Sequence, residues 1–294
     1  MFYHDNKLQY QVRVDKPNPA FAKLLQQAIG GIEGEIRVCL QYLFQAWGNR
    51  GPSKYRDMLL DTGTEEMAHI EMLCTAVALN LEGATSELKD KIAGENPIVS
   101  NILGGMEPRH VISSGMAAMA VDANGVPFNG SWVVGSGNIA ADMYANVMAE
   151  STGRVLATRL YSLTDDSGMK DLLSFLITRD AMHQNQWLAV LEELGGPAVN
   201  LPIPNTFPMS DHVKEFDYTF VSTNISQPSV PADARWASGP SIDGKGEFRY
   251  VSAEPFGQEP VLGPPDVKGY AQEQQMTSGM DKGIFENIKD TLMP

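Results

Sequence analysis

The sequence has few cysteines and no long hydrophobic run. Its two cysteines, Cys39 and Cys74, form no Cys-x-x-Cys or zinc-binding pattern in a chain of 294 residues. A disulfide framework is not needed at this size, so we expect two reduced thiols inside helices and, from them, a cytoplasmic location. No stretch approaches the roughly 18 uncharged apolar residues of a membrane helix. Residues 1–5 lack the basic flank and apolar run of a signal peptide.

Basic residues are also scarce. The chain has 22 lysines and arginines against 36 aspartates and glutamates, which gives a net charge of −14 and a pI near 4.7. Such a surface repels phosphate groups, so neither nucleic acid nor an anionic membrane is expected as a partner. Hydrophobic residues make up 43% and charged residues 20%, the balance of an ordinary globular protein.

Four segments repeat hydrophobic residues at steps of three and four, which is typical of amphipathic helices. The predicted helices cover residues 18–47, 53–81, 138–163 and 166–194. Asn18 followed by Pro19 predicts the start of the first helix, and Gly195-Gly196-Pro197 predicts the end of the last. Hydrophobic residues alternate within residues 1–17, which predicts a short strand or an extended arm.

The connection between the second and third helices is long. Residues 83–137 are rich in Gly, Pro, Asn and Ser, so they form a crossover and the flanking helices need not be antiparallel neighbours. Residues 201–294 hold most of the prolines and only short apolar runs. We therefore expect an arm at 1–17, an all-α, ferritin-like four-helix bundle at 18–200, and a β-containing lobe with an extended tail for subunit contacts at 201–294.

Each predicted helix carries ionisable side chains on its apolar face, near its middle. They are Glu35 on the first helix, Glu66 and His69 on the second, Glu150 on the third, and Asp180 and His183 on the fourth. A buried carboxylate without a partner is costly or protonates. Because all four helices carry such groups, we expect them to converge in the bundle centre, where divalent cations can neutralise them.

The two helix pairs also repeat one another. His69 follows Glu35 by 34 residues, and His183 follows Glu150 by 33. In both pairs an acidic residue stands three positions before the histidine. Di-iron and di-manganese carboxylate bundles take a glutamate from two helices and an acidic-x-x-His pair from the other two. The repeat therefore predicts a dimetal site in which each metal has one glutamate and one histidine of its own.

The donor types narrow the choice of metal. Carboxylates and imidazoles suit manganese, iron or zinc. Asp180 is one carbon shorter than a glutamate and is expected not to reach a metal. Three carboxylates and a bridging hydroxide would then neutralise two divalent ions. If Asp180 did ligate, four carboxylates would favour a di-iron ferroxidase or oxidase. A structural coat-type protein that retains the bundle is a third, non-enzymatic alternative.

With these positions in hand, the chain resembles the manganese catalases. The resemblance covers nearly the whole sequence, and ordinary ferritins lack both the crossover and the long C-terminal lobe. It is carried by Leu8-Gln9-Tyr10, Lys16-Pro17-Asn18-Pro19, Glu35, Gly63-Thr64-Glu65-Glu66-Met67-Ala68-His69, Gly104-Gly105, Gly135-Ser136-Gly137-Asn138, Glu150 and His183. The resemblance implies two manganese ions per subunit and a ping-pong cycle that converts hydrogen peroxide to water and dioxygen.

The resemblance also implies roles for individual residues. Glu66 corresponds to a carboxylate that bridges both manganese ions. Glu35 and His69 would complete the coordination of one ion, and Glu150 and His183 that of the other. Tyr42, two helical turns from Glu35, matches a tyrosine that hydrogen-bonds near the cluster. Glu35 is the side chain expected to move protons, so the expected catalytic residues are Glu35, Glu66, Tyr42 and Asp180.

Two positions depart from the pattern of some family members. These members carry a basic residue before the third-helix glutamate, paired with a glutamate three before the last histidine. Here the positions are Ala149 and Asp180, so this pair cannot form. Arg154 or Arg179 could pair with Asp180 instead, although Arg179 is better explained as a solvated surface residue.

Assembly follows from the resemblance and from the aromatic residues of the C-terminal region. The family is expected to form a homohexamer. A structural calcium between subunits would use Asp57 and Asp61 with Asn224 and Ser226, all oxygen donors suited to a hard cation. The aromatic side chains of the C-terminal region need a surface to cover them, and a neighbouring subunit could provide it: Phe216, Tyr218, Phe220, Trp236, Phe248, Tyr250 and Phe256.

Overall fold

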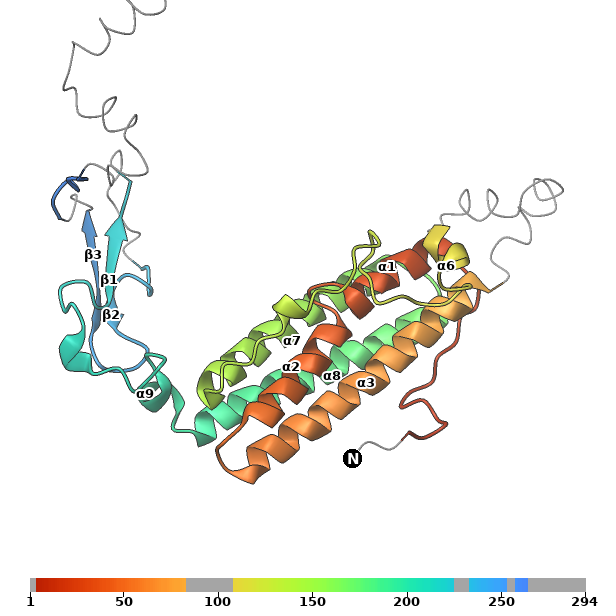
Figure 1. Cartoon of the computed structure of the whole chain (residues 1–294), viewed down its shortest axis with the longest axis horizontal. Helices are drawn as coiled ribbons and strands as arrows, with labels where there is room; N and C mark the ends of the chain where they lie inside the picture. Colours follow the sequence, from red (N-terminus) through yellow and green to blue (C-terminus); the bar gives the residue numbers. More distant parts are fainter. Residues whose placement is uncertain (1–3, 83–107, 225–232, 253–256, 264–294) are drawn as a thin grey trace, which may run out of the picture. The chain divides into compact units, whose positions relative to one another are not determined.

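The computed structural model of the protein describes residues 4–82, 108–224, 233–252 and 257–263. Long helices lie side by side in a bundle (Figure 1). They are α1 (Pro19–Gly30), α2 (Glu35–Gly48), α3 (Ser53–Leu81), α7 (Ile139–Ser162) and α8 (Ser167–Glu193). The described residues also form short helices, α6 (Pro108–Ile112), η1 (Gly130–Trp132), α9 (Gly196–Asn200) and η2 (Met209–Asp211). The predicted helical bundle is confirmed.

The prediction of one continuous helix over residues 18–47 is wrong, because the chain turns between α1 and α2. A Cβ atom on Gly34 would lie 2.7 Å from the Ile29 carbonyl oxygen, so the backbone passes too close for a side chain. The Arg37 guanidinium donates to the carbonyl of Ile32 and steadies the turn. As a result Glu35 becomes the first residue of α2 instead of a mid-helix residue.

Side-chain caps begin three of the helices where they were expected. The Asn18 side chain accepts a hydrogen bond from the Phe21 amide, with Pro19 at the first helical position. Asn138 caps α7, and Asp166 caps α8 by accepting from the amides of Gly168 and Met169. Each cap satisfies amide groups that have no partner within the helix, so the start of each helix is locally determined.

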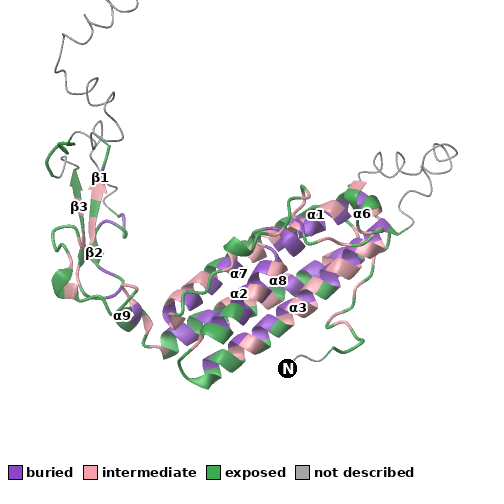
Figure 2. Cartoon of the chain, viewed as in Figure 1, coloured by how far each residue is buried: buried purple, intermediate pink, exposed green. Residues whose placement is uncertain are grey.

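The bundle core consists of two apolar clusters. One cluster joins α1, α3, α7 and α8 and includes Leu25, Leu73 and Leu172. The other joins α2, α3, α7 and α8 and includes Tyr42 and Trp187. Figure 2 shows buried residues along the helix faces that meet inside the bundle. Along both α3 and α8, the predicted metal-binding residues fall between the residues of the two clusters.

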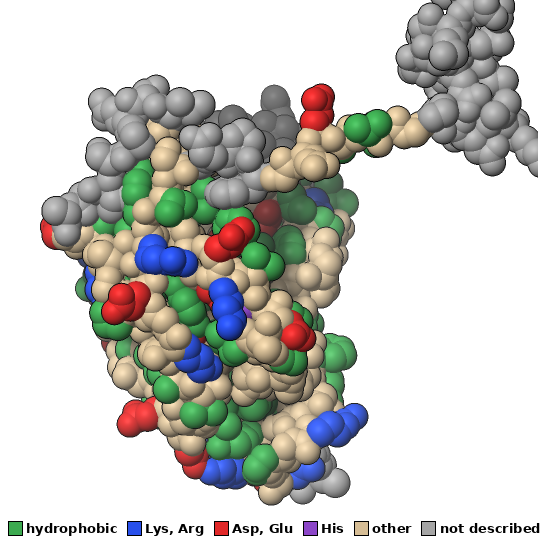
Figure 3. Space-filling view, turned by 90° about the vertical axis from the view of Figure 1, so that its left-hand side faces the viewer, with side chains coloured by type: hydrophobic (Ala, Val, Ile, Leu, Met, Phe, Trp, Pro, Cys, Tyr) green, Lys and Arg blue, Asp and Glu red, His purple; other side chains and the backbone are tan. Residues whose placement is uncertain are grey.

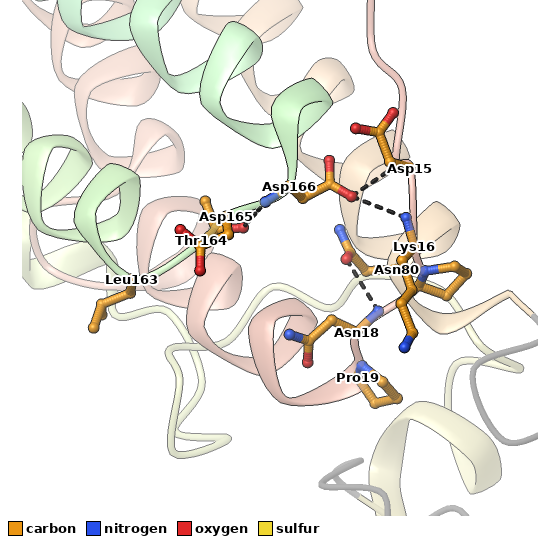
Figure 4. Close-up of a pocket in the computed structure, with 10 residues that line it drawn as sticks. Asp15, Lys16, Asn18, Pro19, Asn80, Leu163, Thr164, Asp165 and Asp166 are labelled. Atoms are coloured by element: carbon orange, nitrogen blue, oxygen red, sulfur yellow. Dashed lines mark hydrogen bonds between the residues drawn. The ribbon is translucent and has the colours of Figure 1, made fainter. Parts of the chain in front are cut away.

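The N-terminal segment is an extended arm, and its described part contains no strand. Leu8, Tyr10, Val12 and Val14 pack against the first apolar cluster, and the Tyr10 ring stacks on Phe175 at 4.4 Å. The amides of Asp15 and Lys16 donate to the Asp166 carboxylate, which ties the arm to the start of α8 (Figure 4). These residues border a cavity of about 570 Å³ that also touches Asn80 at the end of α3.

The described part of the crossover lies against α1 and α2. Buried glutamine side chains bind its backbone: Gln26 donates to the carbonyls of Met119 and Val121, and Gln45 donates to Val134. Buried glutamine amides therefore supply the described part of the crossover with hydrogen bonds that a helix or strand would otherwise have given it. Residues 83–107 of the predicted crossover lie outside the described residues.

The C-terminal region contains a small sheet, as predicted. Strand β3 (Glu247–Ser252) pairs in parallel with β1 (Thr219–Ser222) and antiparallel with β2 (Gly239–Pro240). The chain divides into two compact units, Met1–Tyr218 with Gly239–Phe248, and Thr219–Ser238 with Arg249–Pro294. The proposed boundary between bundle and subunit-contact lobe at residue 200 stays a prediction.

The described surface is mixed in character. Figure 3 shows a face on which hydrophobic, acidic and basic side chains are interspersed. Among the helices that the structure describes, none has the length and apolar character needed to cross a bilayer.

Candidate metal centre

The predicted ligands come together from four helices. Glu35 begins α2, Glu66 and His69 lie on α3, Glu150 lies on α7, and His183 lies on α8. Their donor atoms form two groups, each within 4.8 Å, that could hold a metal ion: Glu35, Glu66 and His69 in one, and Glu66, Glu150 and His183 in the other. Glu66 belongs to both groups, as expected of a bridging carboxylate.

The two oxygens of Glu66 face different histidines. Oε2 lies 2.7 Å from Nδ1 of His69, and Oε1 lies 3.0 Å from Nδ1 of His183. The remaining carboxylates complete each side: Glu35 Oε2 lies 3.7 Å from His69 Nδ1, and Glu150 Oε1 lies 3.4 Å from His183 Nδ1. One carboxylate therefore serves two three-residue donor sets.

Three of the inward-facing donor atoms lack hydrogen bonds. Glu66 Oε1 and the Nδ1 atoms of His69 and His183 are fully buried, and none has a hydrogen-bond partner among the described residues. Leaving such atoms unsatisfied costs free energy, which cations placed between them would recover. The donor set, carboxylate oxygens and imidazole nitrogens without thiolate, fits manganese or another divalent transition metal.

Without cations, the carboxyl groups of the site compete for protons. Burial, together with the negative charge of Glu66, raises the pKa of Glu35 to about 8. Burial and the charges of Glu35, Glu150 and Glu66 raise the pKa of Asp180 to about 9. Burial opposes ionisation of Glu66 too, but His69 and His183 outweigh it and lower the pKa of Glu66 to about 2. Metal binding must therefore displace protons from the site.

Tyr42 touches the centre as expected. Its buried hydroxyl donates a hydrogen bond to Oε1 of Glu150, and its ring lies 4.8 Å from the ring of Trp187. The tyrosine thus holds one candidate metal-binding carboxylate in place from the apolar side of the site.

Asp180 is buried near the centre but belongs to neither donor group. Neither of the two arginines suggested as a partner pairs with it among the described residues. Arg154 donates to the carbonyl of Ile177. Arg179 turns to Glu65 instead of to solvent, with Nε 2.6 Å from Oε1 and Nη2 3.1 Å from Oε2. Ala149 lies buried in the second apolar cluster.

Glu65 is the residue that the sequence analysis missed. Its carboxylate lies 3.2 Å from His183 Nε2 and 3.6 Å from His69 Nε2, on the opposite side of both rings from Glu66. It also accepts a hydrogen bond from Gln9 of the arm. One signal was available, because Glu65 stands four residues before His69 and so shares its side of the helix.

The calcium prediction has no support among the described residues. Asp57 and Asp61 are exposed on α3 and belong to no group that could hold a metal, and Asp57 pairs with Arg56. Asn224 is exposed just after β1, and Ser226 lies outside the described residues. Cys39 and Cys74 are free thiols on α2 and α3, and Cys39 Sγ lies 3.3 Å from the Gly63 carbonyl.

Comparison with known proteins gives a consistent result. The profile of the family described as manganese containing catalase matches residues 1–284. A manganese catalase of Bacillus subtilis (strain 168) is 47% identical over 268 residues, which is 90% of this chain and 95% of that protein. One from Lactiplantibacillus plantarum is 36% identical over 91% of this chain and 98% of its own length. The crystal structure of KatB, a manganese catalase from Anabaena, superposes with a TM-score of 0.65 at 26% identity, covering 85% of this chain and 99% of that one.

Proposed function

The chain belongs to the manganese catalase family, and on that premise we propose that five of its buried side chains hold the metal pair. Membership makes the protein an enzyme, a manganese catalase with a dinuclear carboxylate and histidine site, and hydrogen peroxide is its substrate. The proposed ligands are Glu35 and His69 for one ion, Glu150 and His183 for the other, and Glu66 for both.

One observation carries this assignment: the two oxygens of Glu66 face the Nδ1 atoms of two different histidines. Each ion would receive one oxygen of Glu66, one further carboxylate and one imidazole. Three carboxylates contribute three negative charges, so a hydroxide between two divalent ions would supply the remaining negative charge needed for neutrality. Asp180 belongs to neither donor group, which weighs against the four-carboxylate, di-iron alternative.

Bound there, the manganese pair supplies a two-electron redox couple in a ping-pong cycle, so that one peroxide becomes water and a second leaves as dioxygen. Reduction of the first peroxide to two waters consumes two protons, and oxidation of the second releases two. The side chains of the site must therefore store and return protons between the two half-reactions.

Glu35 and Asp180 are the proposed proton carriers. The Glu35 side chain is 15% exposed, against 2% for Glu66 and 4% for Glu150, so it is the most accessible of the three proposed metal-binding carboxylates. Asp180 adds a second carboxyl group close to Glu35 that no metal-binding role engages. Tyr42 holds Glu150 by a hydrogen bond to the oxygen that faces His183.

A metal analysis combined with an oxygen assay tests the proposed function. Purified protein should contain close to two manganese ions per chain and evolve oxygen from peroxide without haem. The matched control is the same protein stripped by a chelator and reloaded with iron. Iron in the purified protein, with no oxygen release after reloading with manganese, would contradict the proposal and favour the di-iron alternative.

Assembly belongs to the proposal as well. We propose a homohexamer, supported by exposed aromatic side chains such as Phe44 and Trp47 on α2, and Phe220 and Trp236 in the C-terminal region. A calcium ion held by Asp57 and Asp61 with Asn224 and Ser226 would join subunits. Sedimentation of the full chain tests the assembly, because a monomer at micromolar concentration would exclude it.

The two free thiols favour a location in the cytoplasm, where thiols stay reduced.

A further inference from the structure

A single carboxylate lies behind both histidines of the metal centre. Glu65 accepts a hydrogen bond from Nε2 of His183 at 3.2 Å, and Nε2 of His69 lies 3.6 Å from its other oxygen. The Nδ1 atoms of the same two rings point the opposite way, toward Glu66. Each ring therefore stands between the carboxylate of Glu65 on its outer side and that of Glu66 on its inner side.

This arrangement decides which nitrogen is free to bind a metal. A carboxylate can only accept, so an imidazole that faces Glu65 directs its N–H outward at Nε2. The lone pair of Nδ1 is then left facing the metal position, and a fixed ring needs no reorientation on binding. We infer that Glu65 is a positioning residue that orients His183, and more weakly His69, for metal binding, an inference that rests on the proposed function.

Glu65 is itself held from two sides. Arg179 of α8 binds both of its oxygens through Nε and Nη2, at 2.6 Å and 3.1 Å. Gln9 of the N-terminal arm donates to Oε1 at 2.9 Å. A two-pronged guanidinium contact fixes the plane of a carboxylate and balances its charge, so Glu65 adds no net charge beside the metal-binding carboxylates. Gln9 of the arm and Arg179 of α8 thus both contact this one carboxylate.

The two histidines depend on Glu65 to different degrees. The contact with His183 is a hydrogen bond, whereas 3.6 Å from His69 is beyond hydrogen-bond distance. His69 is also held by packing, because Phe175 lies edge-on to its ring at 6.2 Å and Tyr10 covers Phe175. Loss of Glu65 should therefore weaken the Glu150 and His183 side of the centre first.

The test measures manganese affinity by competition with a chelator, together with the melting temperature of the metal-free protein. Glu65→Gln keeps the shape of the side chain but presents an amide that cannot accept from His183 and bind Arg179 in the same way. Removing an outer hydrogen-bond partner of a metal ligand typically costs about 10–100-fold in affinity, and we expect a loss in this range. Glu71→Gln, on the same helix and partly exposed, is the matched control and should bind manganese like the parent protein.

A double mutant separates positioning from general stability. Arg179→Gln should weaken manganese binding less than Glu65→Gln does, and it should add nothing in the Glu65→Gln background, because it acts through Glu65. Gln9→Ala is a milder change, because it removes only one hydrogen bond to the Glu65 carboxylate. The inference is overturned if Glu65→Gln binds manganese within about twofold of the parent, well below the expected range. It is also overturned if the drop in the melting temperature of the metal-free protein accounts for the whole loss of manganese affinity. A parent protein that binds no manganese would contradict the proposed function itself, and the inference with it.

Discussion

Removal of the Glu66 carboxylate should damage both halves of the metal centre. In Glu66→Ala both donor sets lose a ligand, because its two oxygens face His69 and His183 separately at 2.7 Å and 3.0 Å. Glu66→Gln keeps one oxygen and replaces the other with an amide group that cannot bind a metal. The graded series parent, glutamine and alanine therefore removes metal-binding oxygens one at a time.

The size of the effect follows from linkage between binding and folding. At a free manganese concentration about 1,000 times Kd, one occupied site stabilises a protein by about 4.1 kcal/mol, and a 100-fold rise in Kd removes about 2.7 kcal/mol of this. For a cooperative unit of this size each kcal/mol shifts Tm by roughly 2–4 °C. Each damaged donor set should thus lower the Tm of the manganese-loaded protein by roughly 5–11 °C. We expect this drop in Glu66→Gln, where one set is damaged, and about twice this drop in Glu66→Ala, where both sets are damaged.

Calorimetry with and without manganese, combined with metal analysis and oxygen evolution, measures all three consequences. Both variants should lose activity, because the two-electron cycle needs the complete pair. The metal-free Tm serves as the control for damage to the fold. If Glu66→Ala held two manganese ions and melted like the loaded parent, the ligand assignment would be refuted.

Four further predictions follow. Tyr42→Phe should keep both manganese ions and slow oxygen release by no more than about 100-fold, because only a hydrogen bond to Glu150 is lost; a lost manganese equivalent would contradict this. Asp180→Ala should also keep both ions while changing the rate or its pH profile, since Asp180 belongs to neither donor group; loss of one ion would make it a ligand. In the chelated protein Tm should fall as pH rises from about 4.5 toward 8 and 9 and should level off above, because Glu35 and Asp180 stay protonated in the folded state up to their raised pKa values while the unfolded chain has already ionised them. Each carboxyl then removes up to about 1.4 kcal/mol per pH unit, and a Tm that rises with pH in this range would disprove the sign. Finally, truncation after Leu201 should give smaller and less heat-resistant species in sedimentation and melting experiments, and an unchanged assembly would remove the tail from the interface.

Local chemistry determined where the helices lie and which residues could bind metal. Helical periodicity depends only on neighbours three and four residues apart, so residues 53–81 and the spacing of Glu66 and His69 could be predicted without a structure. Caps such as Asn18 and Asp166 act within one turn and were equally readable. The matched spacing of the two helix pairs supplied the candidate ligand set, because two similar helix pairs bring their equivalent positions to one centre.

Contacts between distant segments were decided only in the tertiary structure. The break before Glu35 arises where the backbone of residues 31–34 folds back onto α1, an approach that helical periodicity does not encode. Arg179 turns to Glu65 on α3 and not to Asp180, its neighbour in sequence, because α8 brings its guanidinium beside that carboxylate. Gln9 reaches the same carboxylate across 56 residues of chain. Such pairings depend on how helices and arm pack in three dimensions, so the candidate ligands could be proposed from sequence while the contacts of Glu65 could not.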